Sequence, residues 1–166
     1  LRGVEGRAAG VCFGALGLCL TTPWFTFTRR SRRPPRDPVN AVLSFGYALL
    51  AVLVESAVLR GGFDVALGAF HGVSYGRPSL ALDLMEEWRP VLVDALMLRL
   101  VNRRELSLED FERIEVGEDD LEDAADATGS GASAGPGIWL ADTGRRIVFR
   151  AWGRRLWAVV LAPHLC

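Results

Sequence analysis

The sequence contains no lysine, and all 19 of its basic side chains are arginines. It has only three cysteines, Cys12, Cys19 and Cys166, an odd and sparse set that does not make a disulfide framework and fits a reducing cytoplasm. It has no Cys-x-x-Cys pair and no phosphate-binding glycine loop, so the usual zinc and nucleotide signatures are missing. Acidic residues number 20, and the formal net charge of −1 therefore favours no class of partner.

Long hydrophobic runs are present, and they raise the question of a membrane. Hydrophobic residues make up 50% of the chain, and the mean hydropathy is +0.21. Residues 8–27 carry no charge over a length that could span a bilayer or serve as a signal peptide, but three glycines and a proline interrupt them. Residues 41–54 have the boundaries of a soluble helix, with Asp37 as a candidate cap and Pro38 in the first turn. We therefore expect buried core helices in a cytoplasmic protein, with a membrane hairpin as the less favoured alternative.

The spacing of apolar residues predicts an all-α fold. The helices that we expect span residues 4–20, 38–60, 65–70 and 79–100. Pro90 should kink the last of these or divide it in two. Ser107 and Asp110 form a capping-box pattern that opens a further short helix. Because the first residue is leucine rather than methionine, we expect the sequence to be part of a longer chain.

Residues 112–137 have a different composition from the rest. A run of Asp and Glu is followed by Gly, Ser, Ala and Thr, which cannot bury enough apolar surface to become ordered. We therefore expect a helical core over residues 1–111, a flexible linker over 112–137, and a C-terminal helical segment over 138–166. In that last segment apolar and aromatic residues resume, and we expect a short strand or turn followed by a helix.

The polar residues most suited to chemistry lie between residues 71 and 90. Asp83 and Glu86 are three apart, so they share one face of a helix, and His71 lies in the loop just before it. Two carboxylates and an imidazole suit Mn²⁺ or Mg²⁺ better than Zn²⁺, and such an ion can activate a hydroxyl nucleophile at a phosphodiester. Acidic residues near a helix N-terminus also favour the helix dipole without a metal, and spacing alone favours this structural interpretation.

A second candidate is the basic loop, which we define as residues 29–36. It contains Arg29, Arg30, Arg32 and Arg33 around a single serine. These side chains could contact DNA phosphates, or they could form a solvated loop without a partner, and composition favours neither.

Three ordered segments, residues 3–9, 35–47 and 75–90, resemble the motifs of one family, the CRISPR-associated integrase. Residues 35–47, PRDPVNAVLSFGY, resemble the family motif DPVNALLSFGY. Residues 75–90, YGRPSLALDLMEEWRP, are similar to the family block GRPSLALDLMEEFRP, which a loop histidine precedes. Residues 3–9, GVEGRAA, resemble the helix start GIEGxAA. These matches cover residues 3–111, and their length makes them specific, unlike a short pattern.

The resemblance implies a fold and a metal site. The fold is a helical bundle like the C-terminal domain of that family, with the family's N-terminal β domain missing. The site holds Mg²⁺ or Mn²⁺, and its catalytic ligands correspond here to Glu5, His71 and Glu86, with Asp83 at a supporting acidic position. Glu55 is the rival to Glu5, and we place it as a structural residue or as one that contacts the ligands without binding the metal.

The resemblance also implies roles for further residues near the site. Tyr75, Arg77 and Arg89 are candidates for positioning the site or the phosphate backbone. The arginines of the basic loop become candidates for DNA contact.

The implied activity is metal-dependent cutting and joining of DNA in CRISPR spacer acquisition, a step of antiviral defence. The 3′-hydroxyl of a captured fragment attacks a phosphodiester by transesterification, and attack by water would make the same subunit an endonuclease. The implied partners are DNA, a second copy of the integrase and a small ferredoxin-like subunit, with no membrane. The alternative is an inactive remnant that keeps the fold and binds DNA or a full-length partner, because the β domain is absent and residues 159–166 depart from the family's closing helices.

Overall fold

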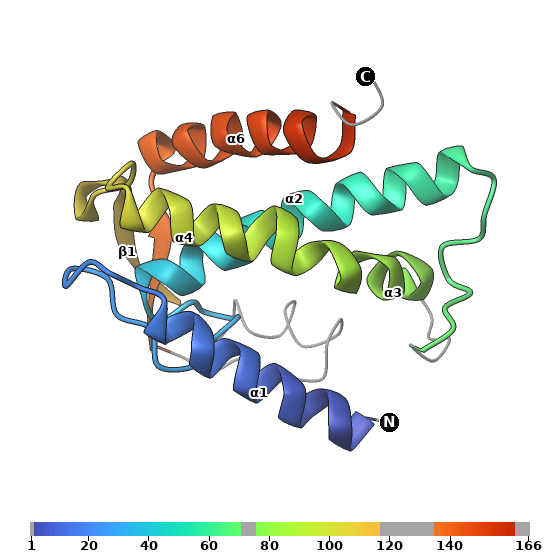
Figure 1. The fold of residues 1–166 in the computed structure, drawn as a ribbon, viewed down its shortest axis with the longest axis horizontal. Helices are drawn as coiled ribbons and strands as arrows, with labels where there is room; N and C mark the ends of the chain where they lie inside the picture. The colour runs from blue at the N-terminus through green and yellow to red at the C-terminus, as the bar shows by residue number, and fades with distance from the viewer. Residues whose placement is uncertain (1, 71–75, 117–134, 162–166) are drawn as a thin grey trace. The chain divides into compact units, whose positions relative to one another are not determined.

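The computed structural model describes residues 2–70, 76–116 and 135–161, which form helices and one small sheet (Figure 1). The elements, in chain order, are α1 Arg2–Leu18, α2 Pro38–Arg60, α3 Ser79–Trp88, η1 Arg89–Asp94, α4 Ala95–Asn102, η2 Leu108–Asp110, β1 Phe111–Val116, β2 Gly135–Leu140, α6 Asp142–Leu156 and η3 Trp157–Leu161. The chain divides into two compact units. Unit 1 contains residues 1–44 and 97–149, and unit 2 contains residues 45–96 and 150–166.

Three of the four expected helices are confirmed, within a few residues at each end. The helix expected over residues 4–20 is α1, which ends at Leu18; residues 38–60 form α2, and residues 79–100 lie in the run from α3 to α4. The helix expected over 65–70 is wrong, because this segment forms turns. Its Ala66 N–H bonds to Asp64 Oδ1 at 2.9 Å, and this local side-chain bond competes with helix formation.

Pro90 divides the helix expected over residues 79–100 into α3 and α4, as predicted, but the chain stays helical between them. Residues 89–94 form the π-helix η1, in which hydrogen bonds reach five residues back, and Ala95 N–H bonds to Pro90 O. Proline lacks an N–H and crowds the preceding turn, so a wider turn accommodates it. Arg155 of α6 donates two hydrogen bonds to Val91 O, at 3.1 and 3.0 Å, and thereby fastens the turn within unit 2.

Unit 1 contains a two-stranded antiparallel sheet, and the all-α prediction is therefore wrong in this detail. Strand β1 pairs with β2 from Phe111↔Leu140 to Val116↔Gly135. The prediction of a linker over residues 112–137 is wrong at both ends, because residues 112–116 lie in β1 and residues 135–137 lie in β2. Residues 117–134 lie outside the described residues. The strand residues within 112–137 could not be recognised, because acidic and small residues dominate the composition of the whole segment. The strand and helix expected after residue 138 are confirmed as β2 and α6.

The segment before α2 packs against strand β2 in unit 1. Ile138 N–H bonds to Pro35 O at 2.8 Å, and Arg36 Nη1 donates to Pro136 O at 2.9 Å. A Cβ at Gly137 would lie 2.6 Å from the Cβ of a loop proline, so glycine permits this close approach. The sheet thus fixes the C-terminal end of the basic loop.

Among the described helices, α2 alone is long and apolar enough to cross a membrane by length and composition. Core helices of soluble proteins pass the same test. Several of its side chains are buried, among them Val39, Val42, Leu43, Leu50 and Val58. In its most apolar 18-residue window 33% is buried, and one such helix is weak evidence for a membrane crossing.

Gly46 marks a close approach between α2 and the π turn in unit 2. A Cβ there would lie 2.7 Å from Val93 Cγ1, and Val93 is buried and β-branched, so its side chain has little freedom to move aside. We expect Gly46→Ala to lower the free energy of unfolding by about 1–3 kcal/mol through overpacking, although alanine is the better helix former.

Urea unfolding followed by circular dichroism measures this effect. The matched control is Gly14→Ala in α1, where an added Cβ meets nothing within 4 Å, and which should raise stability by about 0.5–1 kcal/mol. A gain in stability at Gly46 would contradict the close approach.

Candidate active site

Asp83 ties the segment that precedes His71 to helix α3. Its Oδ2 accepts hydrogen bonds from the backbone N–H groups of Ala69 and Phe70, at 2.6 and 2.9 Å. Gly68 permits this approach, because a Cβ there would lie 2.8 Å from Asp83 Oδ2. The carboxylate that we predicted to support the site therefore fixes the backbone next to the predicted histidine ligand.

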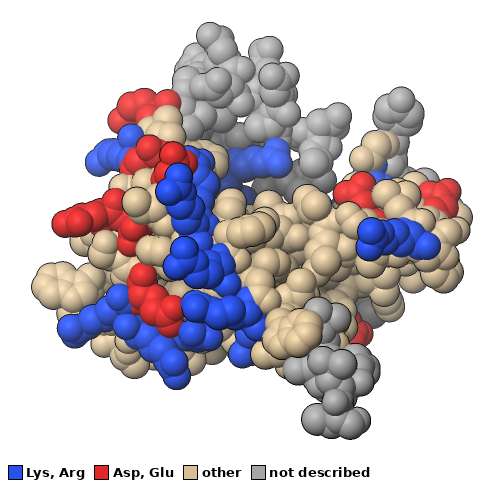
Figure 2. All heavy atoms as spheres, turned by 90° about the horizontal axis from the view of Figure 1, so that it is seen from above, with Lys and Arg blue, Asp and Glu red and all other residues tan. Residues whose placement is uncertain are grey.

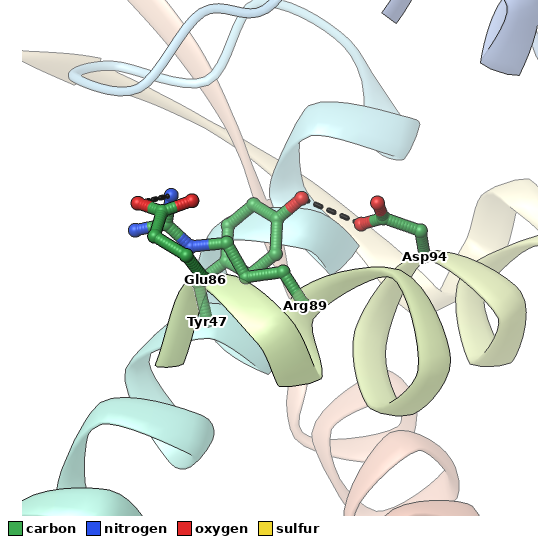
Figure 3. Close-up of polar contacts among 4 residues, drawn as sticks. All are labelled: Tyr47, Glu86, Arg89 and Asp94. Carbon is green, nitrogen blue, oxygen red and sulfur yellow. Dashed lines mark hydrogen bonds and ion pairs between the residues drawn. The ribbon is translucent and has the colours of Figure 1, made fainter. Parts of the chain in front are cut away.

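Glu86 presents an accessible carboxylate on the same helix. Its side chain is 42% exposed and forms an ion pair with Arg89. The Arg89 guanidinium lies over the ring of Tyr47 from α2, with Cζ 5.3 Å from the ring centroid, which is within cation–π range. The Tyr47 hydroxyl donates a 2.5 Å hydrogen bond to Asp94 Oδ1 (Figure 3). Glu86, Arg89, Tyr47 and Asp94 thus form a continuous chain of contacts within unit 2, which we call the Tyr47 network.

Two of the three predicted metal ligands lie outside the described side chains. Glu5 lies in α1 with only its backbone described, and His71 and Tyr75 lie outside the described residues. Among the side chains that the structure describes, no group of three or more His, Cys, Asp or Glu could hold a metal ion. The set Glu5, His71 and Glu86 therefore stays a prediction. Glu55, the rival ligand, is half-buried in α2.

Of the three predicted ligands, the structure describes one side chain, the carboxylate of Glu86, which is an oxygen donor of the kind that hard divalent cations accept. Glu86 offers carboxylate oxygens that remain accessible although Arg89 contacts them. Oxygen donors combined with one imidazole match the preferences of Mg²⁺ and Mn²⁺. Arg77, a predicted positioning residue, is half-buried just before α3, and its Nε has no hydrogen-bond partner among the described residues.

Sequence analysis did not single out Tyr47 or Asp94. Tyr47 is the last residue of the family-like motif of residues 35–47. Its place in that motif was the sequence feature that could have indicated a functional role. Asp94 gave no signal, because residues five apart in a regular α-helix, such as Arg89 and Asp94, point about 140° away from each other. The π turn between them changes this relation, and the sequence shows it only through Pro90.

The basic loop is held in shape by Asn40, which is fully buried. Asn40 Nδ2 donates to Arg29 O at 2.9 Å and to Asp37 Oδ2 at 2.6 Å. Asn40 Oδ1 accepts from Ser31 N–H at 2.9 Å and from Arg30 Nη1 at 2.7 Å. Asp37 Oδ1 in turn accepts from Asn40 N–H at 2.8 Å, which confirms Asp37 as the cap of α2.

The four loop arginines predicted to contact DNA fall into two groups. Arg30 is half-buried, and its guanidinium bonds to Asn40 Oδ1 at 2.7 Å and Ser44 Oγ at 3.0 Å, so it serves the loop itself. The exposed side chains are those of Arg29, Arg32 and Arg33. A further set of exposed arginines lies on helix α6, at residues 145, 146, 150 and 154. Figure 2 shows basic side chains gathered on one face of the molecule.

Asn40→Ala would leave the carbonyl of Arg29 and the N–H of Ser31 without their partner. Because these groups lie against a buried side chain, we expect the free energy of unfolding to fall by about 2–4 kcal/mol in urea titrations. Asn102→Ala is the control, since its two hydrogen bonds, to Thr21 N–H and Cys19 O, are exposed and their loss should cost about 1 kcal/mol or less. Equal losses for the two variants would contradict the special role of Asn40.

Comparison with known proteins gives a consistent result. The family model described as CRISPR associated protein Cas1 matches residues 1–154. The chain is 56% identical over 112 residues to a CRISPR-associated endonuclease Cas1 of Thermus thermophilus, covering 68% of this chain and 33% of that protein. It is 46% identical over 157 residues to a second such protein, from Rhodospirillum rubrum, covering 93% of this chain and 40% of the relative.

A solved structure shows the same fold. It is a partial Cas6-RT-Cas1–Cas2 complex, which matches with a TM-score of 0.80 and 27% identity over 97% of this chain and 43% of that chain. The chain therefore spans between a third and a half of the length of the proteins that it resembles.

Proposed function

Because this chain belongs to the CRISPR-associated Cas1 family, we propose that it is the catalytic helical domain of a metal-dependent DNA endonuclease and integrase. The observation that carries the proposal is the accessible Glu86 carboxylate, which lies in the segment that matches the family block and has a guanidinium beside it. The named relatives are endonucleases, and this supports an activity on phosphodiesters.

The proposed metal ligands are Glu5, His71 and Glu86, which would hold Mg²⁺ or Mn²⁺. The ion supplies positive charge that orients an attacking oxygen and stabilises the phosphate in the transition state. Asp83 holds the backbone of Ala69 and Phe70, the two residues that precede His71 in the sequence. Arg89 places a permanent positive charge beside Glu86, where it can meet a phosphate oxygen.

The proposed substrate is DNA, held mainly through its backbone. Exposed arginines of the basic loop and of α6 provide the charge for phosphate contacts, which position DNA without reading its sequence. The Cas1–Cas2 assembly among the similar structures supports a second copy and a small Cas2-type subunit as partners. We place the protein in the cytoplasm, where its DNA targets lie.

Glu86→Gln removes one negative charge with little change of shape. We expect Mn²⁺-dependent nicking of branched DNA to fall about 100-fold or more, because a ligand is lost, while the melting temperature stays within about 2 °C. Glu87→Gln is the matched control, since Glu87 is exposed, adjacent and carries the same charge. Equal nicking by the two variants would remove the metal mechanism. DNA binding without any nicking by the unmodified chain would favour the inactive binding domain instead.

Arg29→Gln together with Arg32→Gln tests the basic loop. If both side chains contact phosphates, DNA affinity falls and the slope of log affinity against log salt concentration shrinks by about 1–2 units. Arg60→Gln, at the exposed end of α2, should leave the slope unchanged. Arg30→Gln should instead lower thermal stability, because Arg30 bonds within the protein. An unchanged slope in the double variant would exclude the loop from DNA contact.

A further inference from the structure

The Tyr47 network contains two residues to which no role has yet been given, Tyr47 and Asp94. Both are half-buried, and both lie in unit 2. One end of the network is Glu86, a proposed metal ligand, and the other is Asp94, which carries no proposed role in catalysis (Figure 3).

The ion pair between Glu86 and Arg89 does not by itself fix the arginine. It is an i,i+3 pair near the surface, and such pairs contribute little because long side chains lose entropy and water screens them. The second contact is the stack on Tyr47. Only 24% of the Arg89 side chain is exposed, and its Nε is buried without a hydrogen-bond partner among the described residues. The ring face therefore replaces solvent on one side of the guanidinium.

The ring is fixed in its turn by Asp94. A 2.5 Å hydrogen bond to a carboxylate is a strong one, and it stops the tyrosine from rotating away from α3. Arg89 and Asp94 are the first and last residues of the π turn. Because hydrogen bonds in that turn reach five residues back, both residues can contact the same tyrosine, one through the ring and one through the hydroxyl.

We propose that Tyr47, held by Asp94, is a positioning residue that keeps the Arg89 guanidinium against the Glu86 carboxylate. The proposal rests on the proposed function, in which Glu86 is a metal ligand. Arg89 then neutralises Glu86 before a metal binds, and it remains beside the site as a fixed positive charge for the phosphate. Arg89 and a metal ion would share the Glu86 carboxylate and repel each other, so this arrangement weakens metal binding. The positive charge that Arg89 keeps beside the phosphate strengthens catalysis.

A double-mutant cycle tests whether Tyr47 acts through Arg89. The variants are Tyr47→Leu, Arg89→Gln and the two combined, and the measurements are Mn²⁺ affinity by electron paramagnetic resonance, kcat and KM for nicking, and the melting temperature. We expect Arg89→Gln to raise Mn²⁺ affinity about fivefold and to lower kcat about tenfold, since a nearby positive charge is removed. Tyr47→Leu should raise Mn²⁺ affinity about twofold and lower kcat about fivefold, as the loss of one cation–π contact implies.

The combined variant gives the decisive result. If Tyr47 acts through Arg89, adding Tyr47→Leu to Arg89→Gln changes neither Mn²⁺ affinity nor kcat further. Independent, multiplying effects would overturn the proposal, and so would a fall in Mn²⁺ affinity with Tyr47→Leu. Tyr47→Phe keeps the ring but loses the bond to Asp94. Like Tyr47→Leu, it should raise Mn²⁺ affinity and lower kcat, but by smaller factors. It preserves the test if the leucine variant unfolds.

Two controls separate this inference from the proposed function. Phe45→Leu changes an aromatic residue of α2 that lies two positions before Tyr47. Arg60→Gln removes an arginine at the end of the same helix. Neither variant should alter Mn²⁺ affinity. If Glu86→Gln leaves Mn²⁺ binding intact, the metal function itself fails. If Glu86→Gln abolishes Mn²⁺ binding but the cycle shows independent effects, only the role of Tyr47 fails.

Discussion

A proline in the middle of a helical run shapes the Tyr47 network. Pro90 lacks the N–H that a regular helix needs, and the chain continues by widening into a π turn from Arg89 to Asp94. With ordinary helical geometry, these two residues would point in different directions, and Tyr47 could contact only one of them. The wider turn lets it contact both.

The same turn is secured from other elements of unit 2. Gly46 lets α2 approach Val93 closely, and Arg155 donates to the carbonyl of Val91. Both contacts depend on the positions that the π turn gives to Val91 and Val93. A helical defect that would be costly alone is therefore compensated by packing and hydrogen bonding around it. π turns of this kind are frequent at functional sites, and this one begins three residues after Glu86.

Much of the fold could be predicted from local sequence signals. Asp37 and Pro38 mark the start of α2, Pro90 marks the division of the third helix, and Ser107 with Asp110 forms the expected capping box. That box opens a short 3-10 helix followed by a strand. Strand β1 and its pairing with β2 could not be predicted, because both strands are short and the paired residues lie 19 to 29 positions apart in the sequence, which composition does not reveal.

The site was less accessible to prediction than the fold. Spacing placed Asp83 and Glu86 on one helix, but not the bonds from Asp83 to the backbone of residues 69 and 70. Arg30 and Arg32 are equivalent in the sequence, and only the position of Asn40 and Ser44 turns Arg30 inward. Glu5 was identified through family resemblance alone, because no periodicity connects α1 with residues so far along the chain.

The pairing of Val116 with Gly135 has a consequence for how this sequence tolerates change. Antiparallel pairing brings those two positions side by side, so the chain leaves the sheet and re-enters it at nearly the same point. The entropic cost of a loop with adjacent ends grows slowly, by about 0.6 kcal/mol for each doubling of its length. The register of the two strands therefore depends on the paired residues themselves, so a change at Val116 or Gly135 matters more to it than the number of residues that separates them.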